Sequence, residues 1–287
     1  MRRLHALLLC LGAVAAPGSF AAECPAVPDA SRIVVAGGSL TEILYDLGEE
    51  DRIVGVDTTS NHPEDAARFP SIGYVRALSA EGVLSLGPTL ILGEEDTGPP
   101  NVVGQLRSVG VEIVLVPEEH SPEGIVDKVA CVASVIGAGE AAAALMDERL
   151  RPAAERSRAR MAARSERPRG MLVLTLQDGS PLVAGLETSG DGVLRMAGAE
   201  NAFGEVRGWK PISPEAMAVA APDFLVITDR GVREAGGLEE LLAHPTIALT
   251  PAAREGRVFT MDGMRLLGFG PRTLEVADEL AETLRAP

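Results

Sequence analysis

Residues 33–48 read Ile33-Val-Val-Ala-Gly-Gly-Ser-Leu-Thr-Glu-Ile-Leu-Tyr-Asp-Leu-Gly48, and this order of residue types sets the architecture. The first four residues are apolar and mostly β-branched, which predicts a short buried strand that ends at the glycine pair. Ser39 or Thr41 is then placed to cap a helix that Gly48 ends. A second apolar run follows at 53–56. Strand, glycine turn, helix and strand together predict a βαβ unit and an α/β fold.

Two segments of the chain echo one another. Ser79-Ala-Glu-Gly-Val-Leu-Ser-Leu-Gly-Pro-Thr-Leu-Ile-Leu92 has a counterpart in Ser213-Pro-Glu-Ala-Met-Ala-Val-Ala-Ala-Pro-Asp-Phe-Leu-Val226. In each copy a serine can cap a short helix, a glutamate lies in the first turn, and a proline precedes a strand. A weaker echo relates residues 41–51 to residues 190–201. Two echoes in the same order predict two related α/β lobes.

The first lobe is expected over residues 22–138 and the second over residues 169–287. Residues 139–168 are rich in strong helix formers, so a stiff connecting helix is expected to join the lobes. Pro152 should kink this helix or begin a second helical piece. The predicted fold is therefore α/β, with two α/β lobes that have parallel central sheets, a long connecting helix and a ligand cleft between the lobes.

Residues 1–21 have the pattern of a signal peptide, with a basic pair, an apolar run of about a dozen residues and small residues at a cleavage site. The run is shorter than the ~20 residues of a membrane-spanning helix, so we expect export to the periplasm without a membrane anchor. Cys24 and Cys131 remain in the mature chain. They can form a disulfide in an oxidising compartment, but Cys131 is equally explained as a small buried side chain. The sequence leaves both alternatives open.

The chain is strongly acidic, with 26 basic and 41 acidic residues and a formal charge of −15. Nucleic-acid binding needs a basic surface and aromatic stacking positions, so nucleic acids are excluded as partners. The nucleophile-elbow, P-loop and zinc-protease motifs are absent from the sequence. The histidines are far apart in the chain, which argues against a zinc cluster. We therefore do not expect an enzyme.

Residues 71–81 are unusual and read Ser71-Ile-Gly-Tyr-Val-Arg-Ala-Leu-Ser-Ala-Glu81. Tyr74 follows a glycine turn in the loop before the capped helix, and Arg76 lies two residues further on. A nearby cation favours the charged form of a phenol, and a phenolate oxygen suits ferric iron, including haem iron. A loop tyrosine is also commonly a packing residue, so the residues alone leave both roles open.

Three segments carry a family resemblance. They are Gly-Tyr-Val-Arg-Ala-Leu-Ser-Ala-Glu-Gly at 73–82, Gly-Trp-Lys-Pro-Ile-Ser-Pro-Glu-Ala at 208–216 and Met-Asp-Gly-Met-Arg-Leu-Leu-Gly-Phe-Gly-Pro-Arg-Thr at 261–273. In these segments, and over essentially the whole mature chain, the sequence resembles the haem-binding periplasmic proteins of bacterial haem ABC importers, which are helix-strutted, class III periplasmic binding proteins. The resemblance implies that haem is held between the lobes by a tyrosinate. It makes Tyr74 the axial iron ligand and Arg76 its electrostatic neighbour.

The second lobe offers fewer candidate residues. Arg230 follows the strand expected at 224–228 and is placed to reach a haem propionate or the tyrosinate, although a solvated loop arginine explains it equally well. Some relatives have a histidine at the end of the second lobe's first strand, where this chain reads Thr175-Leu-Gln177, so the resemblance does not extend to histidine ligation. Met264 and Phe269 are expected either to line the porphyrin or to belong to the core.

The resemblance also implies an ABC permease as the partner. Glu81 and Glu215 occupy equivalent places in the two echoed helices, one in each lobe, and are expected to dock on arginines of a two-fold permease. The alternative is that both acids only complement helix dipoles. We expect a monomeric haem receptor. A cobalamin or ferric-siderophore receptor of the same fold and an exported haem-dependent enzyme that uses Tyr74 and Arg76 are the competing hypotheses.

Overall fold

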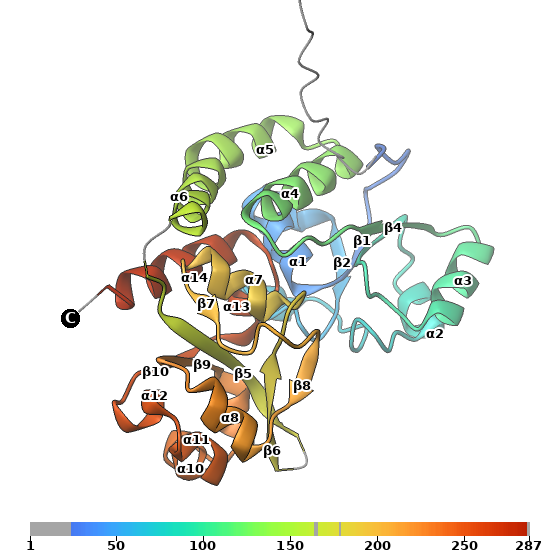
Figure 1. Ribbon diagram of the computed structural model, residues 1–287. Helices are drawn as coiled ribbons and strands as arrows, with labels where there is room; N and C mark the ends of the chain where they lie inside the picture. The colour runs from blue at the N-terminus through green and yellow to red at the C-terminus, as the bar shows by residue number, and fades with distance from the viewer. Residues whose placement is uncertain (1–23, 164–165, 178, 286–287) are drawn as a thin grey trace, which may run out of the picture.

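The computed structural model describes residues 24–163, 166–177 and 179–285, and the signal peptide expected over residues 1–21 lies outside them. Figure 1 shows two α/β lobes, the first in blue to green and the second in yellow to red, with a helical connection across the top of the view. The predicted fold class, two α/β lobes joined by helices, is therefore confirmed. No helix in the described ranges combines the length and apolar character that crossing a membrane requires.

The first lobe is built on a wholly parallel sheet with the strand order β2-β1-β3-β4. Its strands are β1 (Ile33–Ala36), β2 (Ile53–Val56), β3 (Leu90–Glu94) and β4 (Glu112–Val116). The strands are connected and covered by α1 (Gly38–Asp46), α2 (Ala80–Leu84), α3 (Pro100–Ser108) and α4 (Pro122–Ile136), with 3-10 turns at Glu50–Arg52 and Glu64–Arg68. The central strand β1 is completely buried, as its apolar run predicts.

The start of α1 differs from the prediction. Ser39 and Thr41 were expected as caps, but the helix begins directly after Gly37, and no side chain caps it. Gly37 has a φ of 145°, and a Cβ atom there would lie 2.5 Å from the side chain of Glu94, so only glycine fits this turn. The hydroxyls of Ser39 and Thr41 instead bond Glu94 and Ser60.

A parallel sheet was predicted for the second lobe as well, but this sheet is mixed, because two antiparallel strands extend it. Its order is β10-β9-β5-β6-β8, and β7 also pairs with β5. The parallel strands are β5 (Arg169–Gln177), β7 (Glu200–Asn201), β9 (Phe224–Thr228) and β10 (Val258–Met261). The antiparallel strands are β6 (Ser180–Ala184) and β8 (Trp209–Pro211). The parallel order β7-β5-β9-β10 repeats the order β2-β1-β3-β4 of the first lobe, and β6 and β8 are additional.

The helices of the second lobe are α7 (Ser189–Met196), α8 (Pro214–Ala220), α9 (Asp229–Glu234), α10 (Leu238–Ala243), α11 (Pro245–Ala248), α12 (Pro251–Arg254), α13 (Gly263–Leu267) and α14 (Pro271–Thr283). The sequence echoes correspond to equivalent local structures. Ser79 caps α2 and Ser213 caps α8, each by accepting a hydrogen bond from the amide three residues on. Gly48 and Gly198 follow the ends of α1 and α7 with φ values of 70° and 85°.

The connection between the lobes consists of α5 (Gly139–Leu145), a π-helical turn (Met146–Leu150) and α6 (Arg151–Ala162), which follow one another without a break. Pro152 lies in the first turn of α6, where a missing amide hydrogen is tolerated, so it begins a second helical piece as expected.

A disulfide joins Cys24 to Cys131 of α4, with Cα atoms 5.1 Å apart. It ties the segment before β1 to the helix that precedes the connection.

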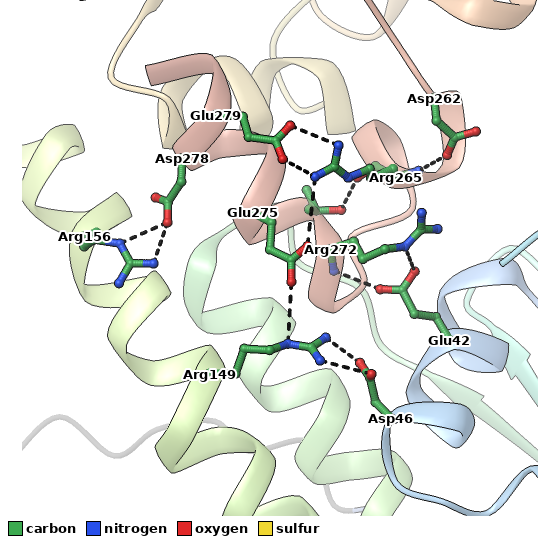
Figure 2. Close-up of polar contacts among 11 residues, drawn as sticks. Glu42, Asp46, Arg149, Arg156, Asp262, Arg265, Arg272, Glu275, Asp278 and Glu279 are labelled. Atoms are coloured by element: carbon green, nitrogen blue, oxygen red, sulfur yellow. Dashed lines mark hydrogen bonds and ion pairs between the residues drawn. The ribbon is translucent and has the colours of Figure 1, made fainter. Parts of the chain in front are cut away.

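Ion pairs connect the first lobe, the helical connection and α14, as Figure 2 shows. Arg149 of the π-helical turn donates to Asp46 of α1 over 2.6 Å and lies 3.6 Å from Glu275 of α14. Arg272 of α14 donates to the buried Glu42 of α1 through its amide (2.8 Å) and its side chain (2.6 Å). These contacts join the lobes on the side where the connecting helices pack.

Candidate functional site

Tyr74 lies in the loop between the 3-10 turn at Glu64–Arg68 and α2, and its neighbours anchor that loop in the core. The side chains of Ile72, Val75 and Leu78 are buried in the hydrophobic cluster on one face of the first sheet. The Tyr74 side chain points away from this cluster and is 43% exposed. The loop therefore buries its aliphatic residues and presents the phenol at the surface.

Backbone hydrogen bonds hold the loop on both sides of the tyrosine. The amide of Thr58 donates to the carbonyl of Gly73 over 2.9 Å. The amide of Gly98 donates to the carbonyl of Val75 over 3.0 Å, and the amide of Leu78 donates to the carbonyl of Gly98 over 2.9 Å. Such pairing to two neighbouring loops limits the freedom of the backbone on both sides of Tyr74.

Arg76 lies beside Tyr74, as the spacing predicts, but it also has a carboxylate partner. Its Cζ atom is 6.0 Å from the centre of the Tyr74 ring, at the limit of a cation–π contact. Its Nε atom donates to Asp96 over 2.6 Å. Burial acts to lower the pKa of Arg76, but the charges of Asp96, Tyr74 and Glu94 and the Asp96 hydrogen bond outweigh it, so the pKa lies above its ordinary value.

Arg230 approaches the same phenol from the second lobe. It lies in the first turn of α9, directly after β9, and its Nε atom donates to Glu234 over 2.7 Å. Thr175 of β5 donates to the same carboxylate and so ties it to the sheet. The Glu234 hydrogen bond and charge raise the pKa of Arg230, and the Tyr74 phenol adds to this effect. Arg76 therefore lies beside the Tyr74 ring, and the charge of Arg230 acts on the phenol from the second lobe.

Tyr45, the other tyrosine of the chain, has a structural role. It lies in α1, packs against the first core, and donates its hydroxyl hydrogen to Asp65 over 2.9 Å. Burial and this hydrogen bond raise the pKa of Tyr45 to about 12. A phenol that is so hard to ionise is poorly suited to bind a metal as phenolate. Tyr45 is thus held inside the first lobe, whereas Tyr74 is exposed at the surface.

Glu81 and Glu215 lie in the first turns of α2 and α8, one in each lobe, and both are exposed. Neither carboxylate forms an ion pair with another residue of the described chain. The pKa of Glu215 is lowered by hydrogen bonds from its own backbone amide and from Ser213, so the carboxylate stays charged. The two acids are therefore free to meet cations outside the molecule.

Of the two candidate porphyrin-lining residues, Phe269 belongs to the core. Its ring is completely buried and lies 4.8 Å from the ring of His120. Met264 is half-buried, and its methyl group lies against the first lobe, since a Cβ atom on Gly38 would come within 2.8 Å of it. Across the described ranges, no three His, Cys, Asp or Glu side chains are placed to hold a metal ion.

A buried polar cluster between the lobes was not predicted from the sequence. Glu94, at the end of β3, accepts a hydrogen bond from the Ser39 hydroxyl over 2.7 Å. The buried Lys128 of α4 donates to Glu118 over 2.6 Å and to Ser39 over 3.3 Å. It also donates to the carbonyl of Gly268 in the second lobe over 3.3 Å. Lys128 therefore links both lobes. The only sequence feature that singled out Lys128 was the rarity of its residue type, because the chain has only two lysines.

The two carboxylates of this cluster have opposite pKa shifts. Burial raises the pKa of Glu94 to about 7, and the nearby charge of Lys128 only partly opposes the rise. Burial also acts to raise the pKa of Glu118, but the hydrogen bond with His120 and the charge of Lys128 outweigh it and lower the pKa to about 2. Glu118 is therefore the charged partner of Lys128, whereas Glu94 changes its charge near neutral pH.

Two α/β lobes whose parallel strands have the same order, joined by helices, form the architecture of a two-lobed solute-binding protein. The chain belongs to the Periplasmic binding protein family, whose profile matches residues 33–264. The membership expected from the sequence motifs is confirmed.

Known proteins of this kind are similar over most of the chain. The structure of the periplasmic haem-binding protein BhuT in complex with two haems matches with a TM-score of 0.80 at 39% identity, over 88% of this chain and 98% of BhuT. The uncharacterised ABC transporter substrate-binding lipoprotein YvrC of Bacillus subtilis (strain 168) is 26% identical over 262 residues, 88% of this chain and 79% of YvrC. A vitamin B12-binding protein of Yersinia pestis (strain Pestoides F) is 28% identical over 203 residues, 69% of this chain and 70% of that protein.

Proposed function

We propose that the protein binds haem through a Tyr74 tyrosinate and delivers it to an ABC permease. The observation that carries the proposal is the exposed Tyr74 phenol, which has Arg76 beside it in the first lobe and Arg230 near it in the second. The 39% identity to a haem-binding protein supports haem as the ligand.

The chemistry of the three side chains suits haem. A phenolate supplies a hard anionic oxygen to ferric iron, and nearby cations favour the phenolate form. Arginine also binds carboxylates in a bidentate manner, so Arg230 and Arg76 are suited to haem propionates. The present partners of these arginines, Glu234 and Asp96, form exposed ion pairs worth about 0–1 kcal/mol each, so a propionate can replace them at little cost.

A titration with ferric haem tests the iron ligand. Wild type should develop the charge-transfer band of a high-spin ferric tyrosinate, whereas Tyr74→Phe and Tyr74→Ala should lack the band and bind haem much more weakly. Tyr45→Phe is the matched control, since it removes the hydroxyl of the other tyrosine and should leave the spectrum unchanged. A normal tyrosinate band in Tyr74→Phe would refute the assignment.

Vitamin B12 is a second candidate ligand, because a vitamin B12-binding protein is 28% identical to this chain. A parallel titration with cobalamin distinguishes the two ligands. Tight cobalamin binding without a spectral response to haem would replace haem in the proposal.

We also propose that the protein is a receptor and not an enzyme. Turnover of peroxide by the haem-loaded protein would contradict this.

The same proposal makes the mature chain an unanchored monomer of the periplasm. Cleavage after residue 21 would leave a first lobe over 22–138, a connection over 139–168 and a second lobe over 169–287. Mass spectrometry of the protein released from the periplasm, together with its elution volume in size-exclusion chromatography, tests processing and oligomeric state. Retention of the protein in the membrane fraction would contradict the unanchored form.

We propose that Glu81 and Glu215 dock on arginines of the permease. Both are exposed carboxylates in equivalent helices of the two lobes, which suits a partner with two-fold symmetry. Charge reversal at both positions should leave haem binding and thermal stability nearly unchanged and should abolish transport into vesicles that contain the permease. The matched control reverses Glu140 and Glu239, two exposed first-turn glutamates of α5 and α10. Transport that survives the Glu81 and Glu215 reversals would refute the docking role.

A further inference from the structure

A buried carboxylate lies beneath the Tyr74 loop and has no part in the proposed ligand contacts. Asp57 directly follows β2 and is only 2% exposed. Its amide donates to the carbonyl of Val35 in the central strand, so its backbone is fixed to the sheet. No cation of the described chain forms an ion pair with Asp57. Its carboxylate is stabilised by hydrogen bonds alone.

Five donors converge on this one carboxylate. Its Oδ1 atom accepts from the amide of Gly37 (3.1 Å) and the hydroxyl of Ser60 (3.0 Å). Its Oδ2 atom accepts from the amides of Thr59 (3.1 Å) and Val75 (3.2 Å). The hydroxyl of Thr59 lies within 2.9 Å of both oxygens. All five groups donate, so the site requires an acceptor with two oxygens.

The three backbone amides come from three different segments. Gly37 is the turn between β1 and α1, Thr59 belongs to the loop after β2, and Val75 follows Tyr74 in the candidate ligand loop. The Val75 amide is the only one of these donors that belongs to the Tyr74 loop. Asp57 therefore attaches the tyrosine loop to the carboxyl end of the sheet from the Val75 side, in addition to the backbone hydrogen bond from Ile72 to Val56 of β2.

We propose that Asp57 is a positioning residue that fixes the Tyr74 loop and thereby holds the phenol in place for the ligand. This inference rests on the proposed role of Tyr74. The donors of Asp57 all belong to the chain itself, so the inference can be tested on the protein before haem is added. Outer partners of this kind commonly change metal affinity by about 10- to 100-fold when they are lost.

Asn is the informative substitution because it keeps the shape and changes one acceptor into a donor. If the new amide group replaces Oδ2, it faces the amides of Thr59 and Val75. If it replaces Oδ1, it faces the amide of Gly37. Both orientations leave at least one buried backbone amide without an acceptor, which destabilises the network. Only the first orientation unpairs the Val75 amide, so Asp57→Ala, which removes both oxygens, is measured beside Asp57→Asn and should loosen the Tyr74 loop in every case.

The experiment combines hydrogen exchange of the free protein with haem release. In Asp57→Ala, the Val75 amide should lose protection by about 10-fold or more, and haem should dissociate about 10- to 100-fold faster, with a weakened tyrosinate band. Asp191→Asn is the matched control. Asp191 is a buried carboxylate of the second lobe that accepts from Asn201 and pairs with Arg195. Its loss should lower stability without changing the Tyr74 loop.

Unchanged Val75 protection and unchanged haem release in Asp57→Ala would overturn the inference, as would an equal acceleration of haem release in Asp191→Asn. If Asp57→Ala does not fold, wild type still gives a test, because the amides of Gly37, Thr59 and Val75 share one acceptor and should exchange together. Rapid exchange of Val75 alone would overturn the inference. Failure of the proposed function is recognised separately, by a normal tyrosinate band in Tyr74→Phe.

Discussion

Glu94 is expected to make the stability of the protein depend on pH, and Glu94→Gln tests this. Burial raises the pKa of this carboxyl from 4.5 to about 7 in the folded protein. Between these two pH values the folded protein holds a proton that the unfolded chain has released. The free energy of unfolding should therefore fall as the pH rises from about 4.5 to about 7 and remain at the lower value above that range.

The size of the effect follows from the two pKa values. At about 1.4 kcal/mol for each pH unit between them, the loss approaches ~3 kcal/mol. Glutamine keeps the oxygen that accepts from Ser39 and has no proton to release. Urea unfolding followed by circular dichroism should therefore give equal free energies for wild type and Glu94→Gln at pH 4.5. The variant should become more stable by about 3 kcal/mol at pH 8.

Two controls separate this effect from a general change of charge. Glu95→Gln removes one negative charge from the exposed position directly after Glu94. The difference in the free energy of unfolding between this variant and wild type should not grow with pH. Glu118→Gln should have the opposite sign and destabilise the protein near neutral pH, because it leaves the buried Lys128 without its counter-charge. A difference between wild type and Glu94→Gln that stays constant from pH 4.5 to 8 would refute the reasoning.

Three further predictions concern other contacts. Arg76→Ala should make haem dissociate at a higher pH than in wild type, because loss of a cation favours the neutral phenol, and superimposable pH profiles would contradict this. Replacing Cys24 and Cys131 by serine should lower the free energy of unfolding by about 2–5 kcal/mol, and reductant should not destabilise the variant further. Arg272→Ala should cost about 3–5 kcal/mol in urea unfolding, since it leaves the buried Glu42 unpaired, and a cost below about 1 kcal/mol would argue against that pair.

Local signals in the sequence predicted the internal repeat and most of the parallel strands, but not the short parallel strands β7 and β10. A serine cap, a first-turn acid and a proline before a strand are all encoded within about a dozen residues, and both copies fold as predicted. The antiparallel strands β6 and β8 were not predicted, since each is short and contains a proline, which weakens its strand pattern.

Only part of the site could be predicted from the sequence, because some of its contacts join neighbouring residues and others join residues far apart in the chain. Tyr74 and Arg76 are neighbours in the chain, so their proximity could be inferred directly. The donors of Asp57 and the partners of Lys128 come from segments as far apart as 140 residues. Such contacts depend on how the strand ends meet in space, and no local pattern encodes them. Buried polar clusters of this kind therefore become visible only in the folded structure.

The internal repeat also explains why only one lobe presents a phenol. Gly73 and Gly208 both have positive φ values, 87° and 74°, and each is followed by an aromatic residue. In the second lobe this residue is Trp209, which is part of β8, pairs with β6 and packs against the core, so its indole is not free to bind a ligand. The second lobe instead contributes Arg230 from α9. The antiparallel extension of the second sheet thus makes the facing surfaces unlike, with an oxygen donor on one lobe and a cation on the other.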